Sequence, residues 1–357
     1  MKYVNNSPYI DILEGAMNFY IFNAPFLQNT KKNSQIKSIS NLYHIGELFN
    51  NHYLLDYVDS LLPKYLVAMD NRDTSFKNGM VGAMSTINNL MDFDLIESEN
   101  RREIFSDMEI LVLKEENFED LIDSIKKNGF LISLMFNNKR DNDFNYLLVL
   151  DQSYQLLNKI NDSIDLYFDF DKEAIEMNLN SQNGLFLMEE VSDKLVQFSL
   201  YLAILEKEKI HENRVVYILK RLETITEKIS QIWLLINSQD KIVKKNIIYI
   251  SLNLLHLCYL QKNIITLKIP LQNYIIDHLN QNSDLDLSDI FKELDILERI
   301  VKVYFFNKEQ NFFSTAEKAL KRIITIEKNF NDIHNLNIIC PIAYSLLTDD
   351  SKYTKLF

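Results

Sequence analysis

Few residues in this 357-residue chain are of the types that perform nucleophilic or acid–base chemistry at neutral pH. It has six histidines and two cysteines. A cysteine or serine nucleophile needs a base beside it, and histidine is the side chain whose ordinary pKa suits that role. No histidine lies between His52 and His211. Cys258 lies in an apolar helical segment and Cys340 precedes a proline near the C-terminus, so we interpret both as structural residues.

Metal and phosphate sites are not indicated either. His44 and His52 are eight residues apart, about two helical turns, and Asp332 and His334 have no third ligand nearby. We interpret these residues as surface, core-edge or helix-cap positions. The sequence contains no GxxxxGK[ST] phosphate loop, no GxGxxG motif, no HExxH motif and no GxSxG elbow. We therefore expect no cofactor and no metal.

Composition and charge exclude two further classes of partner. The net charge of −12 and the pI near 5.1 argue against nucleic acid, which needs a basic face. The N-terminal residues MKYVNNSPYI include no apolar signal segment. The longest apolar stretch, Ile247–Leu260, is interrupted by Asn253 and His256 and indicates a core helix, not a membrane span. Two isolated cysteines fit a reducing compartment, so we expect a cytoplasmic protein.

The elements of the first 190 residues predict an α+β domain with an antiparallel sheet. A helix is expected over Asn117–Lys127 and ends at Asn128-Gly129. Apolar or alternating runs then predict strands; these are Phe130–Phe136, Tyr146–Leu150, Ser153–Lys159 and Ile164–Phe170.

The pattern changes at about Val191. Apolar residues recur every three or four positions between Asn213 and Asn237, which is typical of an amphipathic helix. Further helices are expected at about 241–261, 264–280, 288–306, 314–329 and 335–347. No fixed repeat length is present, so residues 191–357 predict an all-α helical bundle rather than a solenoid.

The order of elements in residues 1–190 resembles the papain-like cysteine peptidases, and among them the bacterial C39-type peptidases and the BtrH-like acyltransferases. PYIDILEGAMNFY matches the family's opening helix, and FEDLIDSIKKNGFLISLMF its next helix and strand. NYLLVLDQ matches the strand that begins with the catalytic histidine, and IDLYFDFD the strand that carries the third residue. The resemblance implies a papain-like domain at residues 1–190, followed by a helical domain.

The same resemblance implies that the catalytic triad has been lost. Where the family has its cysteine, the opening helix offers Ser7 and Tyr9, and Asn145 stands at the histidine position. Asp169 or Asp171 corresponds to the orienting residue. These five residues are the candidates for a degenerate site.

The resulting hypothesis is a non-catalytic papain-like protein that acts as a binding or partner subunit in bacterial peptide or natural-product biosynthesis. Its partner would be a second copy, an active homologue, a carrier protein or a peptide. Two alternatives stay open: an active acyltransferase or amide-forming enzyme with a relocated site, and a helical scaffold or regulator without a small-molecule site.

Overall fold

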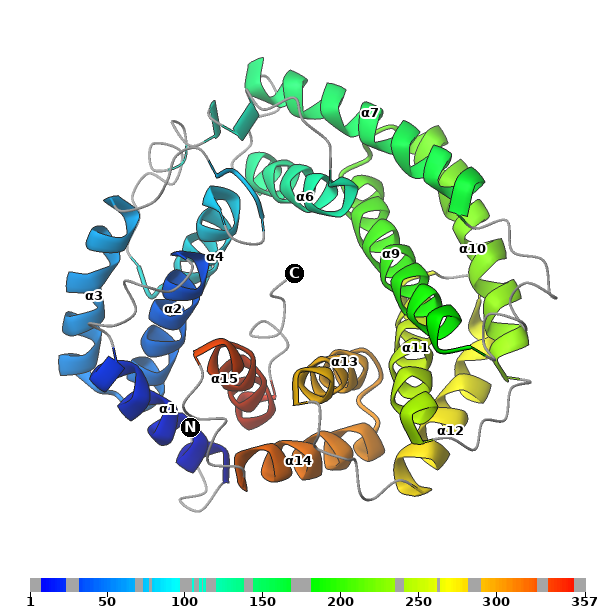
Figure 1. Ribbon diagram of the computed structural model, residues 1–357. Helices are drawn as coiled ribbons and strands as arrows, with labels where there is room; N and C mark the ends of the chain where they lie inside the picture. The colour runs from blue at the N-terminus through cyan, green and yellow to red at the C-terminus, as the bar shows by residue number, and fades with distance from the viewer. Residues whose placement is uncertain are drawn as a thin grey trace. The chain divides into compact units, whose positions relative to one another are not determined.

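The described part of the chain contains thirteen helices and no β-strand in the computed structural model (Figure 1). The predicted α+β domain is therefore wrong, and so is the papain-like resemblance, because that fold requires an antiparallel sheet. The structure describes residues 8–23, 32–67, 73–76, 79–96, 105, 109–110, 112–113, 120–137, 144–167, 181–234, 241–261, 264–281, 290–325 and 333–349.

The segments predicted as strands lie in two helices. Phe130–Phe136 belongs to α6 (Leu121–Asn137), and the next two predicted strands belong to the 24-residue α7 (Phe144–Tyr167). The last predicted strand begins in α7 and continues outside the described residues. In α7 the buried positions recur at helical spacing; they are Tyr146, Val149, Ser153, Leu156, Leu157, Ile160 and Ile164. A short apolar run alone does not distinguish a buried strand from a buried helix.

One compact unit combines residues 1–145 with residues 318–357. It contains α1 (Pro8–Asn23), α2 (Lys32–Leu48), α3 (His52–Val67), α4 (Met80–Asp92), α6 and α15 (Ile333–Thr348). The first helix, α1, packs against the last, α15, and both pack against α2. The chain ends α2 with the left-handed residue Asn50, and the side chain of Asn51 then accepts a hydrogen bond from the Leu54 N–H in the first turn of α3.

The second compact unit, residues 146–317, is built from helical hairpins in two layers. It contains most of α7, then α9 (Gln182–Lys207), α10 (Glu212–Leu234), α11 (Lys241–Leu260), α12 (Ile265–Gln281), α13 (Ile290–Asn307) and the first half of α14 (Gln310–Thr325). Helices α9, α11 and α13 pack side by side in one layer, and α10 packs on α12 in the other. The prediction that the chain is helical beyond Val191 is confirmed.

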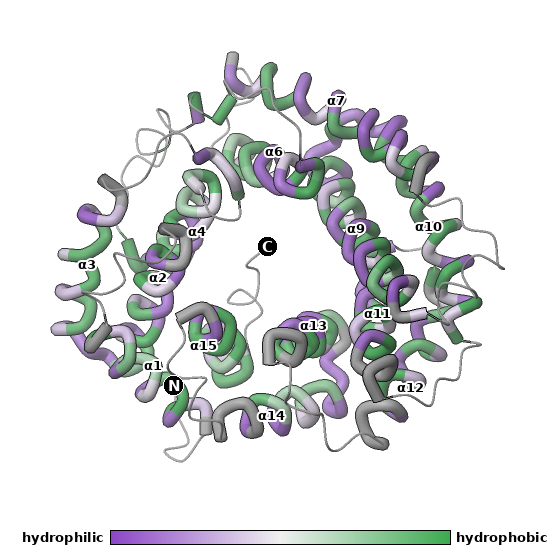
Figure 2. The backbone as a smooth tube through the Cα atoms, viewed as in Figure 1, coloured by the Kyte–Doolittle hydropathy of each residue, from purple (hydrophilic) through white to green (hydrophobic). Residues whose placement is uncertain are grey.

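Hydrogen bonds give the directions of the helices in this second unit. Asn253 of α11 and Gln261, the residue that follows this helix, donate to Ser192 and Ser199 of α9, so α9 and α11 run parallel. A short turn joins α9 to α10, with Lys209 and His211 in the left-handed region. Hydrophobic and hydrophilic residues alternate along α10 (Figure 2), and its buried side is apolar except for Thr226 and Ser230.

None of the helices in the described ranges combines the length and the apolar character that a membrane-spanning segment needs.

Candidate functional site

The structure describes two of the five predicted site residues, Tyr9 and Asn145. Ser7, Asp169 and Asp171 lie outside the described residues. Tyr9 is buried in the first turn of α1, and Asn145 is half-buried in the first turn of α7. Because Asn145 begins a helix and not a strand, it does not hold the position that the family's histidine occupies.

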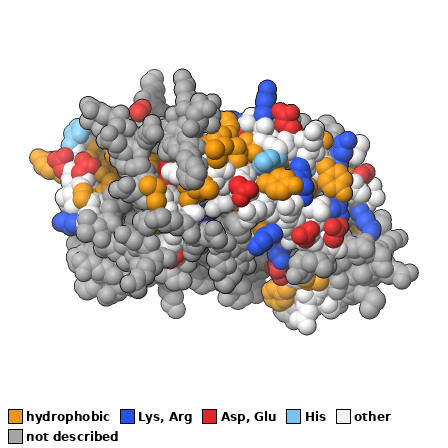
Figure 3. Space-filling model, turned by 90° about the horizontal axis from the view of Figure 1, so that it is seen from above, with side chains coloured by type: hydrophobic (Ala, Val, Ile, Leu, Met, Phe, Trp, Pro, Cys, Tyr) orange, Lys and Arg blue, Asp and Glu red, His pale blue; other side chains and the backbone are white. Residues whose placement is uncertain are grey.

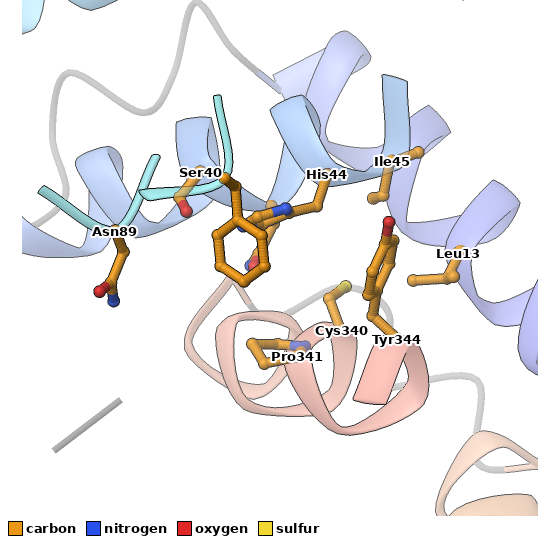
Figure 4. Close-up of a pocket in the computed structure, with 10 residues that line it drawn as sticks. Leu13, Ser40, His44, Ile45, Asn89, Cys340, Pro341 and Tyr344 are labelled. Carbon is orange, nitrogen blue, oxygen red and sulfur yellow. The ribbon is translucent and has the colours of Figure 1, made fainter. Parts of the chain in front are cut away.

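A small pocket in the first unit collects several polar side chains (Figure 4). Its cavity volume is about 30 Å³, which is room for roughly two water molecules. A site for a substrate-sized molecule is about ten times larger. The lining comes from α1, α2, α4 with the residue that follows it, and α15; it consists of Leu13, Ser40, Asn41, His44, Ile45, Asn89, Phe93, Cys340, Pro341 and Tyr344.

His44 and Cys340 are the two groups in this pocket that could react. Burial lowers the pKa of His44 to about 4 and raises the pKa of the Cys340 thiol to about 12. Both groups are therefore neutral at pH 7, whereas a cysteine nucleophile must be a thiolate. The imidazole of His44 packs edge-on against Phe93, with ring centroids 4.9 Å apart. This pocket is not arranged for nucleophilic catalysis.

Behind the pocket, an uncharged hydrogen-bond network joins α1, α2 and α15. The Asn337 Oδ1 atom accepts from Tyr20 Oη at 2.9 Å, and from Ser38 Oγ and Asn41 Nδ2 at 3.1 Å each. Asn41 also donates to Tyr20 Oη at 3.1 Å. All four side chains are buried, and burial raises the pKa of Tyr20. We call these four residues the neutral network, and its clearest role is to fix how the three helices pack.

The second unit contains a serine–histidine pair with hydrogen-bond geometry. His211 Nε2 lies 3.0 Å from Ser153 Oγ and 3.1 Å from the Leu150 carbonyl oxygen. The Ser153 hydroxyl itself donates to that same carbonyl oxygen at 2.7 Å, so it accepts from a protonated Nε2. A histidine that donates to the serine is not its base, and Ser153 is fully buried. The pair joins α7 to α10 and does not form a catalytic dyad.

A charged cluster in the second unit crosses three helices at one level. Tyr249 Oη of α11 donates to the two carboxylate oxygens of Asp193 in α9, at 3.0 and 2.8 Å. Arg299 of α13 donates through Nη2 to Asp193 at 2.5 Å and to Tyr249 Oη at 2.9 Å. Asn253 Nδ2 donates to Asp193 Oδ1 at 2.9 Å. We call Asp193, Tyr249, Asn253 and Arg299 the polar row.

The polar row lies on the side of α11 that faces away from α10. Ser251 faces α10, because its hydroxyl accepts from Nε1 of Trp233 at 2.6 Å. At about 100° per residue, Tyr249 and Asn253 lie roughly 200° from Ser251, and His256 lies roughly 140° from it. The row reaches solvent at its two ends, where 37% of the Asp193 side chain and 17% of the Arg299 side chain are exposed.

The charges of the polar row are stable at neutral pH. Burial lowers the pKa of Arg299, but Asp193 and Tyr249 raise it further, so the net shift is upward. Burial raises the pKa of Tyr249, so its phenol stays neutral. Burial lowers the pKa of the neighbouring His256 to about 3, and Lys302 and Arg299 act in the same direction. The row therefore holds a permanent ion pair beside a neutral imidazole.

The polar row is better suited to binding a ligand than to transferring protons or holding a metal ion. A histidine with a pKa near 3 is a weak base at pH 7. No group of three His, Cys, Asp or Glu residues in the described part of the chain could hold a metal ion. A preformed carboxylate–guanidinium pair with partly exposed ends offers both acceptors and donors to a ligand.

Sequence reasoning missed the polar row because its members come from three helices, and Arg299 lies 106 residues from Asp193 and 50 from Tyr249. The sequence does contain one indication of the polar row, in the spacing of polar residues along α11. Tyr249, Asn253 and His256 follow an i, i+4, i+7 spacing within an otherwise apolar helix, which places three polar side chains on one face.

Comparison with known proteins gives no further assignment: no family model matches the chain, and no curated protein matches it.

Proposed function

We propose that this chain is a binding or partner protein that recognises another protein or a peptide through the polar row of its second unit. The observation that carries the proposal is the position of an ion pair, Asp193–Arg299, on one side of a helical layer with both ends partly exposed. A charged pair that served only to hold the helices together would gain little over apolar packing of the same volume.

The geometry of the row supports recognition of a polar partner. The Arg299 guanidinium stacks on the Tyr249 ring, with 4.6 Å from Cζ to the ring centroid, and Asp193 accepts from three side chains. Both ends of the ion pair are thus held in place before a ligand arrives, so less conformational entropy is lost on binding. Tyrosine and arginine are also the residue types that contribute most at protein interfaces.

The surface outside the row is mixed in character. Hydrophobic side chains lie among charged ones on the face drawn in Figure 3. The largest exposed apolar side chains of the second unit belong to five helices; they include Leu147 and Tyr154 of α7, Phe186 of α9, Tyr217 of α10, Ile269 of α12 and Phe306 of α13. The biosynthetic setting suggested by the papain-like resemblance loses its support with that resemblance, so the proposal extends to binding alone.

The test is partner capture from the native organism with the tagged full-length chain. Asp193→Asn removes one charge of the row, and Asp165→Asn removes a matched charge of the second unit that pairs with Arg221. We expect wild type and Asp165→Asn to retain one partner in comparable amounts and Asp193→Asn to retain at least about tenfold less. Equal capture by all three chains, or capture of no partner by any, would contradict the proposal.

A further inference from the structure

The guanidinium of Arg299 has hydrogen-bonding capacity that the described residues do not use. Arginine has five N–H donors, two on each terminal nitrogen and one on Nε. The two donors of Nη2 are directed to Asp193 and to Tyr249 Oη. Within the described ranges, the two donors of Nη1 and the one of Nε make no hydrogen bond. Three donors of a mostly buried cation are therefore open to a ligand.

The other two arginines of this unit that contact neighbouring helices are used more fully. Arg221 donates through Nη1 to Asn161 Oδ1 at 2.6 Å and through Nη2 to Asp165. Arg214 donates through Nη1 to Tyr154 Oη at 3.5 Å and through Nη2 to Asn158. Both terminal nitrogens of these arginines are thus occupied. Arg221 also stacks near a tyrosine and pairs with an aspartate, so it is a close structural match for Arg299.

The position of Arg299 is suited to an acceptor from outside the chain. Stacking on Tyr249 fixes the plane of the guanidinium, and an arginine held in this way binds anionic oxygens with defined geometry. His256 adds a second buried group, only 5% exposed, whose Nε2 has no hydrogen-bond partner among the described residues. His256 lies about one turn along α11 from Asn253, on the same face, and Asn253 donates to Asp193 of the polar row.

The local charge balance tolerates an anion. Arg299 is balanced by Asp193, and Lys302 by Glu298, whose carboxylate lies 2.7 Å from the Lys302 Nζ atom. These two ion pairs are together neutral, although the net charge of the whole chain is −12. At physiological ionic strength, charges farther than about 8 Å are largely screened.

We propose that the unused donors of Arg299, together with His256, bind an anionic oxygen group of the partner, a carboxylate or a phosphate. This inference rests on the proposed function, because it assigns the chemistry of the ligand at the polar row. The carboxylate or phosphate oxygens accept from Nη1 and Nε while Nη2 keeps its bonds to Asp193 and Tyr249. No covalent bond is made or broken.

The experiment uses the purified full-length chain and three small probes: acetylglycinate, its uncharged amide acetylglycinamide, and inorganic phosphate. Thermal unfolding is followed at rising probe concentration for wild type, Arg299→Lys and Arg221→Lys. A ligand that binds only the folded state raises Tm with concentration. Lysine keeps the charge and the aspartate pair but lacks the extra planar donors. In parallel, side-chain nitrogen spectra of wild type labelled in arginine follow the Arg299 signal directly.

We expect acetylglycinate or phosphate to raise the Tm of wild type and Arg221→Lys and to shift the Arg299 signal, while the amide does neither. Arg299→Lys should bind the active anion about tenfold more weakly or worse. A stronger effect of acetylglycinate indicates a carboxylate ligand, and a stronger effect of phosphate indicates a phosphate group. An unshifted Arg299 signal with every probe overturns the inference even where Arg299→Lys fails to fold. Loss of partner capture in Asp193→Asn with no anion response leaves the proposed function standing and removes the anion site. An anion response with undiminished partner capture by Asp193→Asn removes the proposed function, and with it the assignment of the anion to a partner.

Discussion

Each unit contains a polar cluster that joins three of its helices, and the two clusters differ in charge and in how many of their donors are used. The neutral network of the first unit has no charged member, and Asn337 Oδ1 accepts from three donors. The polar row of the second unit contains an ion pair, reaches solvent at both ends and leaves donors of Arg299 unused. The comparison indicates that a closed, uncharged network serves the fold, whereas an open, charged one serves recognition.

The largest expected effect is loss of stability on breaking the neutral network. Asn337→Ala removes the acceptor of three buried donors, and we expect the free energy of unfolding to fall by about 3 kcal/mol. Urea denaturation measures this fall in the free energy of unfolding. Asn88→Ala is the control in the same unit, because Asn88 hydrogen-bonds only to the neighbouring Asp92 at the surface, and it should change stability by about 0.5 kcal/mol or less. Equal losses of unfolding free energy in the two variants would show that the neutral network stabilises the fold no more than a surface hydrogen bond does.

The next effect is a pH dependence that comes from the buried histidines. The pKa of His256 is about 3 in the folded chain, and that of His44 about 4, against 6.5 for an exposed histidine. Between pH 6.5 and these values the unfolded chain binds protons that the folded chain does not, so stability falls as pH falls. Each histidine contributes a slope of up to about 1.4 kcal/mol per pH unit.

The two buried histidines lie in different units, so a substitution of one of them tests the pH dependence of one unit. His256→Asn should reduce the loss of stability between pH 6.5 and 5 that urea denaturation measures in wild type. His52→Asn is the control, because His52 is exposed. A wild-type stability that is constant over this interval would contradict the burial of both imidazoles.

A smaller effect is expected when the ion pair of the polar row is broken. Asp193→Asn leaves the Arg299 charge without its carboxylate in a mostly buried position, and we expect a loss of about 1 to 2 kcal/mol, discounted because Asp193 is partly exposed. The comparison is Asp165→Asn, whose side chain is 57% exposed and whose loss should be about 0 to 0.5 kcal/mol. Denaturant unfolding of both variants, side by side, tests whether the row differs from a surface pair.

The helices beyond Val191 could be predicted from sequence because each carries a 3.6-residue apolar period, as Val215, Ile218 and Leu222 do in α10. The predicted strands were wrong because FLISLMF and NYLLVL are continuous apolar runs that fit either a strand or a helix.

The polar row and the neutral network could not be predicted from local pattern. Each joins three helices that are distant in sequence, so pairings such as Tyr20 with Asn337 depend on tertiary packing. The resemblance to papain-like enzymes indicates Asn145 as a site residue, whereas the charged side chains meet on α9, α11 and α13.

The most direct test of this account is hydrogen–deuterium exchange of the full chain with and without the partner captured from the native organism. We predict that the partner slows exchange around Asp193 in α9, Tyr249–His256 in α11 and Arg299 in α13, and leaves α1, α2 and α15 unchanged. Protection confined to the neutral network or to α7 and α10, with no change at the polar row, would contradict it.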